Sequence, residues 1–136
     1  MTLKLGEFSV SAIGAGNGPL VLLLHGFPDH AQTWREQISF LAAYGYRALA
    51  VTLRGYEPQS IPEDGDFSEE TLGRDVLNVL DALGVQRAHL VGHDWGAAIA
   101  YRAANLSPDR FLSLTTMAVP HSGRFLNDAF TYPKQA

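Results

Sequence analysis

The chain has 136 residues and a formal net charge of −4, with 46% hydrophobic and 18% charged residues. These values are typical of one soluble globular domain with a hydrophobic core, and they exclude a disordered chain. No cluster of Lys and Arg points to nucleic acid or an anionic membrane as a partner. The absence of cysteine excludes disulfides and thiolate chemistry.

The start of the chain carries no targeting or membrane signal. Residues 1–5 lack the apolar core of a signal peptide, and the apolar run at residues 20–24 is far too short to span a bilayer. We therefore expect a cytoplasmic enzyme that has no membrane as a partner.

Strands and helices are predicted to alternate along the chain. In order, they are strands at 7–13 and 20–24, a helix at 32–44, a strand at 46–51, a helix at 68–83, a strand at 88–91, a helix at 97–106 and a strand at 111–117. Ser68 is a good N-cap for the second helix, and Gly84 is placed to end it. This order predicts an α/β fold, with a parallel sheet and helices on both faces.

A small-x-Asp-x-small pentapeptide joins the strand at 88–91 to the helix after it. It reads Gly92-His93-Asp94-Trp95-Gly96. This is the layout of a nucleophile elbow, in which a strand, a very tight turn and a helix present a reactive side chain at the apex. The glycines fit because a Cβ at position 92 or 96 would clash where strand and helix meet, and the apex residue is usually strained. The usual apex residue is serine, but here it is Asp94.

Two interpretations of Asp94 compete. Aspartate is a favoured helix N-cap, so in isolation Asp94 could serve only as a cap. The flanking glycines, together with His25-Gly26-Phe27-Pro28 after the neighbouring strand, favour a nucleophile. At a helix N-terminus the dipole favours the anion, which predicts a low pKa for Asp94.

Four motifs occur in order at suitable separations: His25-Gly26-Phe27-Pro28, Arg54-Gly55-Tyr56, Gly92-His93-Asp94-Trp95-Gly96 and Pro108-Asp109-Arg110. Together they resemble the α/β-hydrolase superfamily, specifically its aspartate-nucleophile branch of epoxide hydrolases and haloalkane dehalogenases. The resemblance covers nearly the whole chain. It implies that residues 1–118 are the N-terminal part of an α/β-hydrolase core, and that residues 119–136 begin a cap or linker.

The resemblance also implies a mechanism. In that branch the apical carboxylate attacks a saturated carbon and forms an alkyl-enzyme ester, which a water activated by His then hydrolyses. The resemblance makes Asp94 the nucleophile and assigns the oxyanion hole to the backbone N–H groups of Phe27 and Trp95. It assigns the substrate pocket to His25, Pro28 and Trp95, although core packing equally accounts for the Trp95 side chain. For His25, a role in shaping the oxyanion turn is favoured over one in proton transfer. No metal or cofactor is expected, since no set of His, Asp and Glu has metal-ligand spacing.

A small hydrophobic epoxide is the expected substrate, and a halide is the alternative. In one large subclass of dehalogenases an Asn follows His-Gly, where this chain has Phe27. That subclass has an acid after the strand that follows the elbow helix, where this chain has Ala118-Val119-Pro120. Both differences favour an epoxide hydrolase over a haloalkane dehalogenase. A third interpretation is a non-catalytic half-domain that binds a ligand or a partner.

Family members are longer than this chain. After the strand ending near Met117 they insert a mostly helical cap, in which paired tyrosines donate to the epoxide oxygen. Later strands bring the catalytic acid and the water-activating His. We therefore expect no turnover by this chain alone. We also expect the strand Phe111–Met117 to expose an edge that pairs with a second copy or with a complementary C-terminal half.

Overall fold

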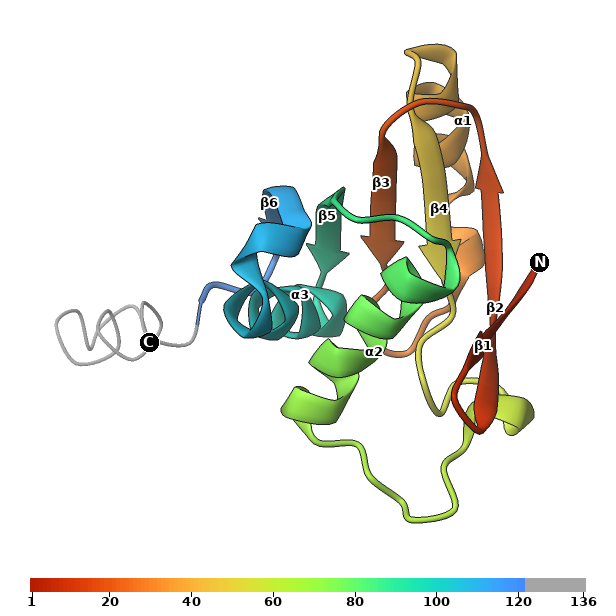
Figure 1. Ribbon diagram of the computed structural model, residues 1–136, viewed down its shortest axis with the longest axis vertical. Coiled ribbons are helices and arrows are strands. Elements are labelled where there is room, and N and C mark those ends of the chain that lie inside the picture. The colour runs from red at the N-terminus through yellow and green to blue at the C-terminus, as the bar shows by residue number, and fades with distance from the viewer. Residues whose placement is uncertain (122–136) are drawn as a thin grey trace, which may run out of the picture.

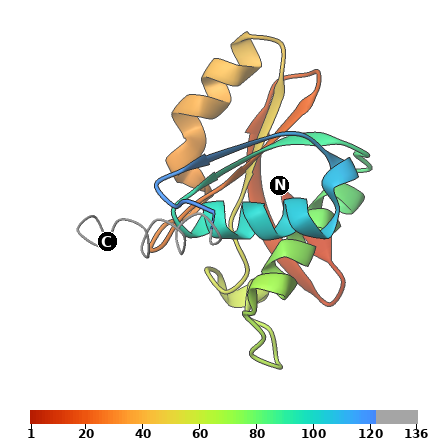
Figure 2. The same cartoon turned by 90° about the vertical axis from the view of Figure 1, so that its left-hand side faces the viewer.

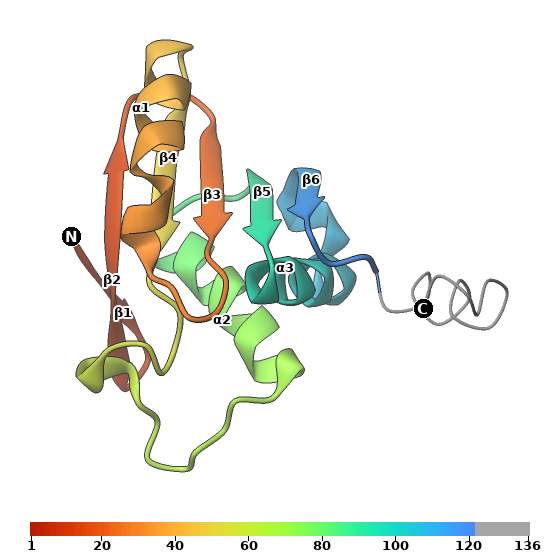
Figure 3. The same ribbon diagram turned by 180° about the vertical axis from the view of Figure 1, so that it is seen from behind.

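The structure is a computed structural model and describes residues 1–121, which form one six-stranded sheet flanked by helices (Figures 1 and 3). The strands are β1 (Thr2–Leu5), β2 (Phe8–Ala15), β3 (Leu20–Leu24), β4 (Arg47–Val51), β5 (Ala88–His93) and β6 (Phe111–Met117). The helices are α1 (Arg35–Ala43), α2 (Glu69–Ala82) and α3 (Trp95–Leu106). Short 3₁₀ turns lie at Ala31–Trp34, Pro58–Ser60 and Pro108–Arg110.

The strands lie in the order β1-β2-β4-β3-β5-β6. Strands β4, β3, β5 and β6 are parallel, whereas β1 and β2 pair antiparallel at one side. The predicted fold class, a mostly parallel sheet with helices on both faces, is confirmed. Because neighbouring parallel strands end at the same edge of a sheet, the segments that follow β3, β4, β5 and β6 gather there.

One strand was not predicted, and one predicted helix begins differently. The strand predicted at 7–13 is found as β2, but an additional strand, Thr2–Leu5, precedes it and forms a hairpin with β2 through a turn in which Gly6 has a φ of 69°. Only Leu3 and Leu5 of this short strand are buried, so it offers little hydrophobic pattern. The helix predicted over 32–44 begins instead as the 3₁₀ turn Ala31–Trp34, where Nδ1 of His30 accepts the N–H of Gln32.

Strand β3 divides the core into two layers. Leu22 and Leu24 pack on the side of α2 and α3, whereas Val21 and Leu23 pack on the side of α1, together with Trp34. Figure 2, turned by 90°, shows α1 separated by the sheet from α2 and α3. Full burial of one such leucine contributes about 1.5–3 kcal/mol. Strand β3 is therefore stabilised by packing on both of its faces, and this fixes the position of the segment that follows Leu24.

Polar contacts define the beginning of α2. Oγ of Ser68 accepts the N–H of Thr71, so the predicted N-cap is confirmed. The Asp66 carboxylate accepts the Thr71 O–H at 2.6 Å and the Ser68 N–H at 2.9 Å. These bonds stabilise the charged form and lower the pKa of Asp66 to about 2.

The loop after β4 is anchored to α2 by a buried ion pair. Nε and Nη2 of Arg54 donate to the two carboxylate oxygens of Asp75 at 2.7 and 2.8 Å. The Arg54 guanidinium also lies 4.3 Å from the centre of the Phe8 ring. The backbone that begins at Leu53 is therefore fixed relative to the helices.

Strand β6 lies at the end of the sheet opposite to β1 (Figure 1). Within residues 1–121 no strand pairs with its outer edge, and the side chains of Leu112, Leu114 and Met117 are exposed. The predicted cap or linker at 119–136 falls mainly on residues 122–136, which lie outside the described part of the chain. In that described part, no helix has the length and apolar character needed to cross a membrane.

Candidate active site

Asp94 lies at the apex of a tight turn between β5 and α3. Its backbone has φ 57° and ψ −122°, a conformation that side-chain-bearing residues rarely adopt. A Cβ at Gly92 would meet the carbonyl oxygen of Gly96, and a Cβ at Gly96 would lie 2.5 Å from the carbonyl oxygen of His25. The predicted clash at both glycines is therefore confirmed, and the chain has the geometry of a nucleophile elbow.

The Asp94 carboxylate faces the turn that follows β3. The Phe27 N–H donates to Oδ2 of Asp94 at 3.1 Å. The backbone N–H of Trp95, the next residue in the chain, is a second group that stabilises the charged carboxylate. These two N–H groups, that of Phe27 first, lower the pKa of Asp94. The direction is as expected from a position at a helix N-terminus, and the first cause is the Phe27 N–H from the neighbouring turn.

The side chain of Asp94 does not act as a helix cap. The residue occupies the N-cap position of α3, yet its carboxylate makes no capping hydrogen bond to the first turn. The carboxylate instead accepts a hydrogen bond from Phe27, which lies in the turn after β3. The competing interpretation of Asp94 as an ordinary N-cap is therefore wrong.

A third glycine allows the two turns to approach each other. A Cβ at Gly26 would lie 2.6 Å from Cβ of Asp94 and 2.9 Å from its Oδ2. Any side chain at position 26 would push Asp94 away from the Phe27 N–H. The residue types of both turns thus bring one carboxylate and two N–H donors together.

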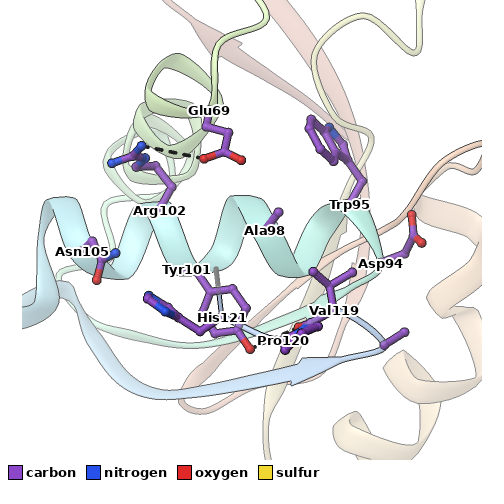
Figure 4. Close-up of a pocket in the computed structure, with 11 residues that line it drawn as sticks. Glu69, Asp94, Trp95, Ala98, Tyr101, Arg102, Asn105, Val119, Pro120 and His121 are labelled. Carbon is purple, nitrogen blue, oxygen red and sulfur yellow. Dashed lines mark hydrogen bonds and ion pairs between the residues drawn. The ribbon is translucent and has the colours of Figure 1, made fainter. Parts of the chain in front are cut away.

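A hollow of about 570 Å³ opens beside Asp94 along the outer side of α3 (Figure 4). It is lined by residues of α3, the start of α2 and the segment after β6: Glu69, Asp94, Trp95, Ala98, Tyr101, Arg102, Asn105, Ala118, Val119, Pro120 and His121. Its end near Asp94 is largely apolar. Its far end is polar, with Nη2 of Arg102 at 3.7 Å from Oε2 of Glu69.

Only some of the predicted pocket residues line this hollow. Trp95 does, with 41% of its surface exposed, so core packing of its side chain is excluded. Phe27 and Pro28 are exposed on the neighbouring turn. The structure places His25 behind that turn, fully buried, and not in the wall of the hollow.

The other lining residues on α3 were not among the predicted site residues. Trp95, Ala98, Arg102 and Asn105 recur at the spacing of one helix face, a signal present in the sequence. The position of the segment after β6 was not predictable in this way. Tyr101 holds that segment by hydrogen bonding Oγ1 of Thr116 at 2.7 Å and the carbonyl oxygen of Val119 at 3.2 Å.

Two other residues near the site have distinctive environments. Burial and the charge of Asp94 raise the pKa of Tyr56, whose ring packs edge-on against His25. Ala118 has a φ of 71°, a left-handed conformation that asparagine tolerates better than alanine. The backbone after β6 therefore turns sharply at the mouth of the hollow.

Comparisons with known proteins agree with this architecture. The family described as alpha/beta hydrolase fold matches residues 19–135. An epoxide hydrolase from Caballeronia sordidicola is 45% identical over 117 residues, which are 85% of this chain and 35% of that protein. Epoxide hydrolase 3 from Siraitia grosvenorii is 38% identical over 88% of this chain and 38% of its own length.

A solved structure shows the same arrangement of elements. The crystal structure of an epoxide hydrolase from Vigna radiata superimposes with a TM-score of 0.84 at 35% identity, covering 89% of this chain and 38% of that chain. The chain thus spans between a third and two fifths of the length of these relatives.

Proposed function

The chain belongs to the α/β-hydrolase family, and we propose that it carries the nucleophile of an epoxide hydrolase, Asp94. One observation carries the proposal: a strained apical aspartate whose carboxylate accepts a hydrogen bond from the backbone N–H of Phe27 and is stabilised in its charged form by that of Trp95. The similarity to three epoxide hydrolases supports this reaction over others of the family. Residues 1–118 would then be the N-terminal part of the hydrolase core, followed by the cap or a linker.

In the first step, Oδ1 of Asp94 attacks a saturated carbon of the epoxide ring while Oδ2 stays against the Phe27 N–H. A C–O bond forms to the enzyme, and the strained C–O bond of the ring breaks. Its electron pair moves to the epoxide oxygen, which takes a proton from a water molecule to become a hydroxyl and leaves hydroxide in solution. The product is a hydroxyalkyl ester of Asp94. A carboxylate suits this step because its low pKa keeps it ionised at neutral pH.

In the second step, water attacks the carbonyl carbon of this ester. Negative charge then develops on the oxygen that faces Phe27 and Trp95, where two N–H groups are already in place. One such donor contributes about 3–4 kcal/mol to the transition state. The resemblance assigns the water-activating His to a segment after the cap. We therefore propose that the 136-residue chain alone reaches the ester and goes no further.

The test uses the 136-residue chain and styrene oxide. Intact mass spectrometry should show the addition of one epoxide, and peptide mapping should place the ester on Asp94. Asp94→Asn should remove the adduct, whereas the control Asp109→Asn, which alters an exposed acid far from the elbow, should keep it. An adduct that persists in Asp94→Asn would overturn the assignment. Release of diol over many turnovers would overturn the proposed arrest at the ester.

Two alternatives give different results in the same experiment. A haloalkane dehalogenase would release bromide from 1-bromohexane and leave styrene oxide unchanged. A half-domain that only binds would form no ester with either compound. It would also bind phenylethanediol, the product of styrene oxide hydrolysis, equally well before and after Asp94→Asn.

We also propose that β6 pairs with another strand, from a second copy or a complementary C-terminal half. Its edge and its exposed Leu112 and Leu114 support this. Sedimentation should show a dimer of the 136-residue chain, and Thr115→Pro should weaken it by disrupting the strand. A monomer that stays soluble at high concentration would contradict the proposal.

A further inference from the structure

The imidazole of His25 lies directly behind the peptide that carries the Phe27 donor. It is 0% exposed. Its Nε2 accepts the N–H of Leu53 at 2.9 Å, and its Nδ1 lies 2.7 Å from the carbonyl oxygen of Gly26. Because Nε2 accepts and a carbonyl oxygen cannot donate, Nδ1 carries the proton. Burial lowers the pKa of His25, so the ring is neutral at neutral pH.

The Gly26 carbonyl and the Phe27 N–H belong to one peptide group. In a planar trans peptide these two groups point in opposite directions. The bond from His25 holds the carbonyl on the buried side, so the N–H points to the other side, where Oδ2 of Asp94 accepts it. A rotation of this peptide would break both hydrogen bonds together.

The residue at position 26 does not itself fix this peptide. Glycine is conformationally the least restricted residue. A larger residue is excluded, because its Cβ would lie 2.6 Å from Cβ of Asp94. The close approach of the two turns therefore requires glycine, a flexible residue, next to the Phe27 N–H donor. The hydrogen bond from the His25 side chain supplies the restraint that glycine lacks.

We propose that His25 is the positioning residue of the Phe27 donor, acting through its hydrogen bond to the Gly26 carbonyl while Leu53 holds the ring. The Leu53 N–H belongs to the loop that Arg54 anchors to Asp75 of α2. The Tyr56 ring, 4.8 Å from the imidazole and edge-on to it, packs against the same histidine. That the Phe27 donor serves catalysis rests on the proposed function. The hydrogen bonds that position the donor do not depend on it.

Two isosteric variants separate the hydrogen bonds of His25. The amide nitrogen of Asn occupies the place of Nδ1, so His25→Asn keeps the bond to Gly26 and loses that to Leu53. The amide oxygen of Gln occupies the place of Nε2, so His25→Gln keeps the bond to Leu53 and loses that to Gly26. Both side chains are neutral amides, and each leaves one partner of the imidazole without a bond.

The readout is the titration of the Asp94 carboxyl carbon by NMR, with the Phe27 amide proton as a second probe. We expect His25→Asn to retain a pKa for Asp94 below the ordinary value of 3.8. His25→Gln should shift it upward and move the Phe27 amide proton upfield, as its hydrogen bond weakens. Equal effects of the two variants, or no effect of His25→Gln, would overturn the proposal.

A measurement on the unaltered chain covers the case in which neither variant folds. Nitrogen NMR of His25 should then show the proton on Nδ1, whereas a proton on Nε2 would overturn the proposal. Neither readout depends on reaction with an epoxide. If Asp94 formed no ester but these NMR results held, the proposed function alone would be wrong.

Discussion

The N–H of Phe27 donates a hydrogen bond of 3.1 Å to Oδ2 of Asp94, although the two residues are 67 positions apart in the sequence. Each residue follows a different parallel strand, β3 for Phe27 and β5 for Asp94, and these strands are direct neighbours in the sheet. The bond is therefore a consequence of sheet topology. It joins the turn after β3, which carries the Phe27 donor, to the turn after β5, which carries the proposed nucleophile.

This bond predicts the pH dependence of ester formation. Attack requires the carboxylate, and the N–H groups of Phe27 and Trp95 lower the pKa of Asp94 below 3.8. The rate of ester formation should therefore stay constant near neutral pH, and the midpoint of its fall at acid pH should lie below 3.8. Rates measured by mass spectrometry, in buffers where the fold is intact by circular dichroism, provide the check. A decline that begins near pH 6 would point to a different titrating group.

Asp94→Gly should stabilise the chain. The backbone of Asp94 has φ 57° and ψ −122°, which glycine adopts without strain, and such strain costs about 1–3 kcal/mol. Asp94→Ala is the matched control, since it also removes the carboxylate but keeps the Cβ. Thermal denaturation should therefore show Asp94→Gly with the higher melting temperature of the two. Equal melting temperatures would mean that the elbow stores no such strain.

Gly96→Ala should destabilise the chain far more than Gly84→Ala. A Cβ at Gly96 would meet the carbonyl oxygens of Leu24 and His25, which belong to a buried strand and its turn. A Cβ at Gly84 meets nothing within 4 Å, although its φ of 67° still makes alanine unfavourable by about 1 kcal/mol. Urea denaturation compares the two, and we expect a difference of several kcal/mol. Similar losses would show that α3 shifts easily away from β3.

Arg54→Met should cost about 3–5 kcal/mol, because it leaves the carboxylate of Asp75 buried without its partner. The two side chains are only 9% and 12% exposed. The matched control is Arg74→Met, which removes an exposed i,i+4 pair with Glu70 and should cost less than about 1 kcal/mol. Urea denaturation measures both. Addition of Asp75→Leu to Arg54→Met should recover much of the loss, since it removes the unpaired charge.

Thr71→Val should raise the pKa of Asp66. The Thr71 O–H is the largest cause of its low value of about 2, and valine keeps the shape of the side chain without the donor. Because the pKa is lowered on folding, the contribution of Asp66 to stability is present above pH 3.8 and lost as the pH falls toward 2. Carbon NMR of the carboxyl group gives the pKa directly. An unchanged value in Thr71→Val would assign the shift to Ser68.

Local sequence determined the features that depend on neighbours along the chain. Gly92, Asp94 and Gly96 specify a strand, a tight turn and a helix, because glycine allows a close approach that other residues do not. The N-cap at Ser68 and the buried strand Leu20–Leu24 followed from capping and hydrophobicity in the same way. The strand Thr2–Leu5 was not predicted because only two of its residues are buried. Its extended structure depends on pairing with β2.

Tertiary structure decided how the groups around Asp94 are placed. The sequence predicted a low pKa for Asp94, and the first cause of it is the N–H of Phe27, which reaches Asp94 because β3 and β5 are neighbours. The sequence placed His25 in the substrate pocket, whereas the fold buries it behind the Gly26 peptide. Residue types and their spacing identify a reactive aspartate. Which donors surround it depends on strand order, because hydrogen bonds across a sheet join segments that are distant in the sequence.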